Sequence, residues 1–235
     1  MKLGIMQPYF CPYIGYFSLI KHTDEFILFD VVQFIRHGWI ERNRILKQSG
    51  GTVYIQVPLM KHSRETLIKD LQIRNTENWK SKIRAQLTFY KKGNRYYSNV
   101  IEVIESVFKN EYNSIVKLNR DMLVAICEFL SIDTKIKIYS EMNLKIDKVN
   151  APDEWALNIC KSYAAYEYWN PPNGKSFFDK SKFSDAGIEL KFHDVKISKY
   201  QQIGHIFEPR LSIIDVMMHN DPCTINNFLD SYNLE

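Results

Sequence analysis

The chain has 235 residues, of which 45% are hydrophobic and 25% are charged. This composition supplies enough apolar side chains for a core and is unlike that of a disordered protein. The 31 basic and 27 acidic residues leave a net charge of +4, far from the one-sided charge of a typical nucleic-acid binder. Nucleic acid is therefore not expected as a partner.

The amino-terminal segment has the pattern of a strand, a turn, a helix and a second strand. Residues 2–6 form a short apolar run, and 8–11 form a turn. A helix is expected over 12–21, because Pro12 suits the first helical position, where its missing N–H would have no partner. A second apolar run at 26–29 reads as a strand parallel to the first.

The rest of the chain predicts a helical middle section between further strands. Polar and charged residues dominate 33–45, a stretch with no clean helix or strand that is typical of a functional loop. We predict an α/β fold in a single domain over 1–235, with a parallel sheet built on the N-terminal strand-helix-strand unit. The other expected elements are strands at 51–58, 136–139 and 187–192 and helices at 76–90, 99–108, 115–129, 150–163 and 212–218.

Two short motifs in the carboxyl-terminal half have simple structural interpretations. Ser212 and Asp215 have the spacing of a capping box at the start of a helix. Residues 170–174, Asn-Pro-Pro-Asn-Gly, predict a tight turn, with a ligand-binding loop as the alternative.

Polar residues follow both amino-terminal strands. If the strands are parallel neighbours, Gln7 and Asp30 lie at the same edge of the sheet, where α/β proteins usually bind ligands. The Gln7 amide can donate and accept hydrogen bonds, which suits contact with a substrate. The alternatives are a turn shaped by proline and packed by tyrosine, and an Asp30 that caps the following turn. The turn adds three candidate substrate contacts: Pro8, Tyr9 and Tyr13.

A second cluster combines aromatic, basic and amide side chains. It consists of Trp39, Arg42, Asn43 and Arg44. Guanidinium groups form bidentate hydrogen bonds to phosphate, and an indole offers a stacking face. This combination suits a phosphorylated, flat or sugar-like ligand, with the two arginines as a phosphate clamp. The simpler alternative is a solvated basic loop.

The cysteines lack the spacing of a disulfide framework or a metal site. They stand at Cys11, Cys127, Cys160 and Cys223, and the six histidines share no recognisable spacing either. The sequence has no signal-peptide pattern and no apolar stretch long enough to span a membrane. We therefore expect a protein of the reducing cytoplasm, with no membrane insertion, no metal and no bound cofactor.

Residues 6–16, Met-Gln-Pro-Tyr-Phe-Cys-Pro-Tyr-Ile-Gly-Tyr, resemble the signature of the WbqC-like protein family. The resemblance covers nearly all of the chain, continuing at 30–34, 39–45, 170–174, 200–202 and 207–215. It implies a role in the bacterial biosynthesis of surface polysaccharide of the O-antigen type, beside enzymes that make modified amino sugars.

The resemblance also adds residues to the expected site. It places Gln33, Tyr200 and Gln202 among the substrate contacts. Family members often carry a histidine where this chain has Ile83, so His62 is the expected substitute. The layout around Tyr13-Ile-Gly-Tyr also echoes nucleotidyltransferases that carry His-x-Gly-His there, which hints at a nucleotide-shaped cleft without their phosphate chemistry.

We expect the transfer of an acyl or aminoacyl group to the amine of a nucleotide-linked amino sugar. Asp30 or His62 would act as the base, and Gln7 and Asn43 as polarising donors. Holding the two substrates together could supply much of the rate. The acyl donor would be a thioester, free or on an acyl carrier protein. The alternative is a non-catalytic subunit that binds a sugar nucleotide or a carrier protein. Amidotransfer through a cysteine thioester is disfavoured by the missing Cys/His arrangement.

Overall fold

The computed structural model describes residues 1–204 and 206–235. Its first two strands, β1 (Lys2–Met6) and β2 (Glu25–Leu28), are joined by helix α1 (Ile14–Lys21). The strands are parallel neighbours, and the end of β1 pairs with the end of β2. This confirms the strand-helix-strand unit predicted from the sequence.

The unit forms the centre of a six-stranded sheet with the order β5-β2-β1-β6-β7-β8. Strands β5 (Lys135–Ile138), β6 (Glu167–Asn170) and β7 (Glu189–Val195) are parallel to β1, and β8 (Tyr232–Leu234) is antiparallel to β7. A separate antiparallel hairpin is formed by β3 (Arg42–Leu46) and β4 (Thr52–Gln56). The predicted α/β fold with a mostly parallel sheet is therefore confirmed.

Helices cover both faces of the sheet, so its central strands are apolar on both sides. Leu3 and Ile27 pack with α5 (Glu154–Ser162) and α6 (Lys180–Asp185). Phe26 on the opposite face packs in a larger cluster with the remaining helices. Those helices are α1, α2 (Trp79–Leu87), α3 (Tyr97–Phe108), α4 (Ile115–Phe129), α7 (Ile213–His219) and α8 (Pro222–Leu229).

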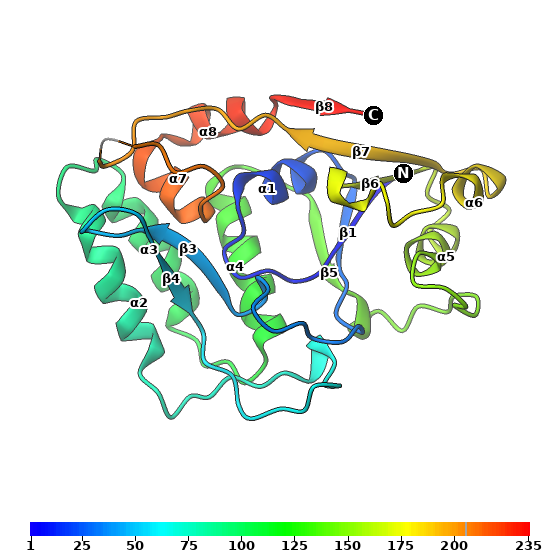
Figure 1. Ribbon diagram of the computed structural model, residues 1–235, viewed down its shortest axis with the longest axis horizontal. Helices are drawn as coiled ribbons and strands as arrows, with labels where there is room; N and C mark the ends of the chain where they lie inside the picture. The colour runs from blue at the N-terminus through cyan, green and yellow to red at the C-terminus, as the bar shows by residue number, and fades with distance from the viewer. Residues whose placement is uncertain (205) are drawn as a thin grey trace.

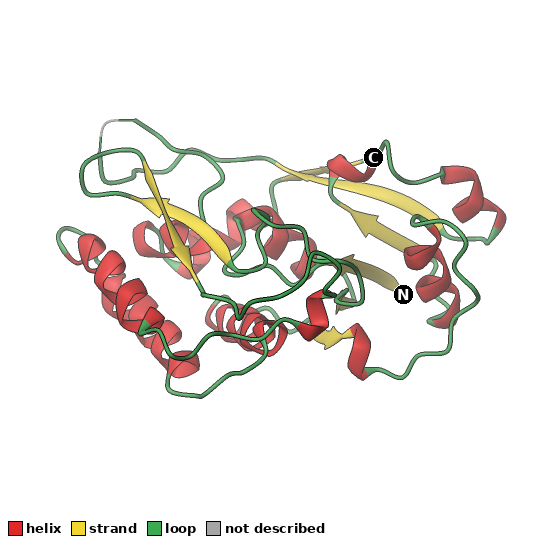
Figure 2. Ribbon diagram, turned by 60° about the horizontal axis from the view of Figure 1, so that its bottom comes forward, coloured by secondary structure: helices red, strands yellow, loops and turns green. Residues whose placement is uncertain are grey.

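The hairpin and the helices α2 and α3 lie together at one end of the molecule, and α5 and α6 lie at the other (Figures 1 and 2). Short 3-10 helices join the main elements. Their bounds are Ile68–Asp70, Thr88–Lys91, Tyr139–Glu141 and Pro172–Gly174. The last of these is the tight turn that the sequence predicted after residue 170.

Several boundaries differ from the prediction for local reasons. Helix α1 begins at Ile14, not at Pro12, because the Pro12 carbonyl accepts a hydrogen bond from the Ile213 N–H and keeps the chain extended. Helix α2 is capped by the Asn78 side chain and ends before the 3-10 helix 88–91. Helix α3 begins at Tyr97, two residues before the predicted start at residue 99.

Within the described ranges, no helix combines the length and the apolar content needed to cross a membrane.

Candidate functional site

The sheet has a topological switch point beside β1. The chain leaves β1 for β2 on one side and later returns to place β6 on the other side. Crevices at the carboxyl ends of strands around such a point are the usual ligand sites of open α/β sheets. Gln7 follows β1 and Asn170 ends β6, so both lie at this edge. The Gln7 side chain is half-buried, and the Asn170 amide donates to the Tyr168 hydroxyl (2.6 Å).

Buried amides hold the turn at residues 8–12 that follows Gln7. The Asn43 amide donates to the carbonyls of Phe10 (3.1 Å) and Cys11 (2.9 Å), and the Asn119 amide donates to the carbonyl of Pro8 (2.8 Å). Cys11 has a φ of +42°, a conformation that costs a non-glycine residue about 1–3 kcal/mol. Both amide hydrogens of Asn43 are therefore engaged by the 8–12 turn. The predicted role of Asn43 as a donor to substrate is replaced by a positioning role.

Two partly buried tyrosines, Tyr9 and Tyr13, lie within and directly after the 8–12 turn. The Tyr13 ring lies over Gly15, where a Cβ atom would meet the ring at 2.5 Å. Burial raises the pKa of Tyr13, the Arg210 guanidinium opposes this, and Asp194 adds to it. Burial, and to a smaller degree Tyr13, raises the pKa of Tyr9. Both hydroxyls therefore stay protonated at neutral pH and can donate hydrogen bonds to an anion beside Arg210.

One side of the hairpin carries cations stacked on aromatic rings. Arg42 and Arg44 alternate along β3, with the Arg42 guanidinium 4.4 Å from the Tyr54 ring centroid and the Arg44 guanidinium 5.9 Å from that of Trp39. We call Trp39, Arg42, Arg44 and Tyr54 the cation-aromatic face. Arg42 also donates to the His37 carbonyl (2.7 Å). The buried Nε of Arg44, by contrast, has no hydrogen-bond partner among the described residues.

Backbone and amide contacts bring the two predicted clusters together. The Phe10 N–H donates to the Trp39 carbonyl (2.9 Å). The Asn119 amide that holds Pro8 also donates to the Ile40 carbonyl (2.8 Å). The backbone of residues 39–40, which leads into the cation-aromatic face, is therefore held against the 8–12 turn at the switch point.

Asp30 is closed off from this region. Its side chain is 1% exposed and accepts hydrogen bonds from the Ser140 N–H (3.0 Å) and hydroxyl (2.6 Å). Ser140 follows β5, which lies on the opposite side of β2 from β1, so the carboxylate is bonded away from Gln7. Burial raises the pKa of Asp30, and the Ser140 hydrogen bonds oppose the rise. Asp30 does follow β2 at the predicted edge of the sheet, but its carboxylate is buried and is not accessible to a substrate.

Gln33 and His62 belong to two loop segments that lie side by side. The Gln33 amide donates to the Arg64 carbonyl (2.7 Å), and the His62 ring meets the Phe34 ring edge-on at 5.1 Å. Gln33 is exposed and His62 is half-buried, with Nδ1 3.0 Å from the Ser63 carbonyl. Of the two predicted bases, His62 is the one that solvent can reach.

Glu41 was missed by the sequence analysis. Its side chain is 7% exposed, and its Oε2 atom has no hydrogen-bond partner in the described part of the chain. Burial raises the pKa of this carboxyl group, and Arg42, His37 and His62 oppose the rise. Its position between Trp39 and Arg42, inside a stretch already singled out, is the signal that could have identified it.

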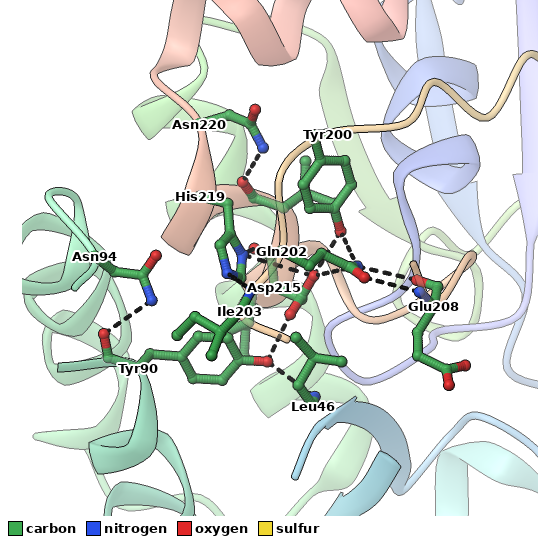
Figure 3. A network of polar contacts seen from close by, with 12 residues as sticks. Leu46, Tyr90, Asn94, Tyr200, Gln202, Ile203, Glu208, Asp215, His219 and Asn220 are labelled. Carbon is green, nitrogen blue, oxygen red and sulfur yellow. Dashed lines mark hydrogen bonds and ion pairs between the residues drawn. The ribbon is translucent and has the colours of Figure 1, made fainter. Parts of the chain in front are cut away.

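Tyr200 and Gln202 lie in a different environment, a buried network around Asp215 (Figure 3). Asp215 is fully buried and accepts hydrogen bonds from Tyr90 (2.7 Å), Tyr200 (2.5 Å) and the Gln202 amide (2.9 Å). Burial, with Asp215 adding to it, raises the pKa of both tyrosines. Tyr200 and Gln202, which were predicted to extend the site, therefore attach the loop before α7 to that helix.

The same network corrects the capping-box prediction. The Ser212 hydroxyl accepts from the Ile214 N–H and caps α7 as expected, but Asp215 is used by the network. His219 completes the network, because its Nε2 accepts from the Ile203 N–H (3.1 Å). Its Nδ1 must then carry the proton and donate to the Asp215 carbonyl (2.7 Å), so the imidazole is neutral.

The described part of the chain also contains a small cavity, an open groove and the buried Cys11. A cavity of about 10 Å³ beside Tyr200 and Arg210 has room for roughly one water molecule. A groove of about 300 Å³ between α3 and α4 has an acidic rim formed by Glu102 and Glu128. Cys11 is buried, which raises the pKa of its thiol. Over residues 1–204 and 206–235, no group of three His, Cys, Asp or Glu side chains is arranged to hold a metal ion.

One comparison with known proteins identifies the family. A sequence profile of the WbqC-like protein family matches residues 7–227. The chain is also 31% identical over 221 residues to the uncharacterised protein Rv1507c of Mycobacterium tuberculosis, a match that covers 93% of each chain. No solved structure matches the chain. The family match begins at Gln7 and includes both clusters of the candidate site.

Proposed function

The chain belongs to the WbqC-like protein family, and from this premise we propose that it transfers an acyl or aminoacyl group to the amine of a nucleotide-linked amino sugar. The pathway would be the biosynthesis of a bacterial surface polysaccharide of the O-antigen type. The observation that carries the proposal is the Arg44 guanidinium. It lies 5.9 Å from the centroid of the Trp39 ring, and its buried Nε–H has no hydrogen-bond partner among the described residues.

The nucleotide part of the substrate matches the cation-aromatic face. Trp39 is 37% exposed, so its ring can stack on a base. Arg44 would form charge-assisted hydrogen bonds to the diphosphate, because its fork of N–H groups fits two phosphate oxygens. Arg42 shares the clamp, although part of its hydrogen-bonding capacity is used by the His37 carbonyl. The hydroxyls of Tyr9 and Tyr13 add neutral donors at the switch point.

The sugar and the acyl donor would meet at the edge occupied by Gln7. Its half-buried amide can polarise the acyl carbonyl, and His62 is the open candidate base. Direct attack of the amine on a thioester needs no covalent enzyme intermediate, so the buried Cys11 is not required. Approximation of the two substrates supplies much of the rate. The donor would be a thioester, free or attached to an acyl carrier protein.

A second candidate is a non-catalytic subunit that binds the sugar nucleotide, or a carrier protein, for a partner enzyme. It is favoured by the closure of Asp30 and by the two engaged hydrogens of Asn43, which remove two of the four predicted catalytic groups. The cation-aromatic face would serve either function equally well.

Mass spectrometry separates the two candidates. The purified protein is incubated with nucleotide-linked amino sugars and acyl thioesters, and the molecular mass of the sugar nucleotide is measured before and after the incubation. We expect the mass to rise by that of one acyl group less one hydrogen. Tight binding of the sugar nucleotide, without product from any donor, would favour the binding subunit instead.

Arg44→Lys tests the clamp by calorimetric titration with a nucleoside diphosphate. Lysine keeps the charge but loses the fork, and a hydrogen bond to a charged group contributes about 1.5–3 kcal/mol, so we expect roughly tenfold or greater weakening. Arg74→Lys is the matched control, because Arg74 pairs with Glu77 on an exposed surface. Equal affinities for Arg44→Lys and the unchanged protein would remove Arg44 from the site.

A further inference from the structure

Glu41 is a buried carboxylate that the fold leaves incompletely paired. Its side chain is 7% exposed, and Oε2 lacks a hydrogen-bond partner in the described ranges. Burying a carboxylate without full compensation costs several kcal/mol in general, so such groups are rare unless a ligand completes them. The fold therefore retains at Glu41 a group that is unfavourable for stability alone.

The charged neighbours of Glu41 do not complete it. The Arg42 guanidinium is directed to the Tyr54 ring and the His37 carbonyl. His37 and His62 are close enough to influence the pKa of Glu41, yet neither forms a hydrogen bond with it. The Oε2 atom can accept a hydrogen bond, and a positively charged donor would compensate the carboxylate best.

Glu41 is also anchored beside the candidate site. Its carbonyl accepts from the Val57 N–H (2.8 Å), which fixes it against the strand of the hairpin that pairs with Arg42. The two preceding residues, Trp39 and Ile40, are bonded to Phe10 and Asn119 at the 8–12 turn. A ligand stacked on Trp39 would therefore have Glu41 within the same stretch of chain.

We propose that Glu41, in place of His62, receives the ammonium group of the amino sugar and accepts its proton. This assignment rests on the proposed function and names the group that selects an amine over a hydroxyl. An ammonium offers three N–H donors and a compensating charge, whereas a hydroxyl offers one donor and no charge. The burial that makes Glu41 unfavourable alone would strengthen its attraction to the ammonium.

The transfer balances with a thioester as the co-reactant. The Glu41 carboxylate takes one proton from the ammonium, and the free amine attacks the acyl carbon. The C–N bond forms, and the C–S bond breaks as the sulfur leaves with the electron pair of that bond. The nitrogen loses a second proton as the amide forms. One of the two protons ends on the thiolate, and the other reaches the solvent, so Glu41 is again a carboxylate.

Glu41→Gln tests the assignment because it keeps the shape and removes the charge. Affinities are measured by calorimetry for a nucleotide-linked amino sugar and for the same nucleotide sugar with a hydroxyl at that carbon. We expect the unchanged protein to prefer the amine by roughly tenfold or more, a preference set by the hydrogen bonds to a charged group. The variant should lose this preference and keep its affinity for the hydroxyl form. Glu77→Gln, at an exposed ion pair, is the control.

Unfolding in urea gives a second measurement that keeps the test decisive. A carboxylate retained for a ligand costs stability, so Glu41→Gln should unfold at the same or a higher urea concentration than the unchanged protein. A variant that keeps the amine preference, or one that unfolds at clearly lower urea, would overturn the assignment. If neither nucleotide sugar binds the unchanged protein, the proposed function itself fails. That outcome can be told apart from a retained amine preference and from unfolding at lower urea, which overturn only the assignment of Glu41.

Discussion

At the residue scale, the candidate edge depends on amide side chains that bond to backbone. Asn43 and Asn119 are buried, at 4% and 0% exposure, and together they hold three carbonyls of the 8–12 turn. A strained turn that contains Cys11 at positive φ needs such partners, because Asn43 and Asn119 supply the side-chain donors of the buried Phe10 and Pro8 carbonyls. The strain and the bonds that offset it lie directly beside Gln7.

Asn43→Ala should therefore act on stability. It leaves the Phe10 carbonyl without the Asn43 donor, whereas the Cys11 carbonyl keeps the hydrogen bond from the Ser212 hydroxyl (2.8 Å). One unsatisfied buried group costs about 1–3 kcal/mol, so we expect the free energy of unfolding to fall by roughly that amount. Urea denaturation measures this. Asn99→Ala, on the exposed side of α3, should change it by less than about 0.5 kcal/mol. A similarly small change for Asn43→Ala would show that the 8–12 turn keeps its conformation without the Asn43 hydrogen bonds.

The sequence predicted which segments form the edge better than it predicted which side chains are open there. Gln7 could be placed because parallel strands end together. Asp30 could not be judged, because its partner Ser140 lies 110 residues away in the chain. Tyr200 and Gln202 were predicted as substrate contacts from the family pattern alone. In the structure both side chains donate hydrogen bonds to the Asp215 carboxylate. Glu41 stayed unnoticed because nothing in one sequence reveals burial of a charged residue.

At the scale of elements, α1 begins with a close contact between a ring and a glycine. The Tyr13 ring occupies the space that a Cβ at position 15 would need, at 2.5 Å from its ring atoms. Glycine in a helix is normally less favourable than alanine by up to about 1 kcal/mol, so its use here reflects the ring. The helix gives up some stability and gains a fixed orientation of Tyr13.

Gly15→Ala should therefore have opposite effects in two backgrounds. With Tyr13 present, the added methyl group displaces the ring and destabilises the protein by about 1–3 kcal/mol, the usual cost of overpacking. With Tyr13→Ala, the same change should be neutral or stabilising by up to about 1 kcal/mol. A double-mutant cycle in urea measures the coupling. Equal effects in both backgrounds would contradict the contact.

Helices and strands were predicted correctly where apolar residues recur with a regular period. They were missed where the element is short or consists largely of polar and charged residues. Helix α4 has the expected bounds of 115–129, because its buried side is regular. Strand β3 was taken for a loop, since its inward residue Asn43 is polar and its outward residues Arg42 and Arg44 are charged. Strand β6 was missed because it has only four residues before two prolines. Its pairing with β1 can be recognised only in three dimensions.

At the scale of the whole molecule, His193 connects segments from both ends of the chain. Its Nε2 is 3.1 Å from the Ser18 hydroxyl on α1, and its ring centroid is 4.3 Å from that of Tyr232 on β8. The Ser18 hydroxyl donates to the Leu229 carbonyl (2.5 Å), so it must accept the His193 N–H. His193 is 3% exposed. Burial, with His22 contributing, lowers its pKa from 6.5 to about 4.

Stability should fall as the pH falls through this window. Between about pH 6.5 and pH 4 the unfolded chain binds a proton at His193 that the folded chain refuses, so protonation favours unfolding. We expect the free energy of unfolding to drop by about 2 kcal/mol between pH 7.5 and pH 5 from this residue alone. His193→Gln, measured by urea denaturation at both pH values, should lose that part of the pH dependence. An unchanged pH dependence in the variant would contradict the assignment to His193.

The central place of β1 in the sheet has a consequence for how the protein is made. Lys2 pairs with Glu167, so β1 leaves the ribosome well before a neighbour that is translated some 165 residues later. At about 5–20 residues per second, this interval lasts roughly 8–30 s. Throughout it the nascent chain presents an apolar strand with one row of unpaired N–H and C=O groups, the kind of edge that aggregates readily. Chaperones that attend translation would find their target at that edge, and the emergence of β6 would release them.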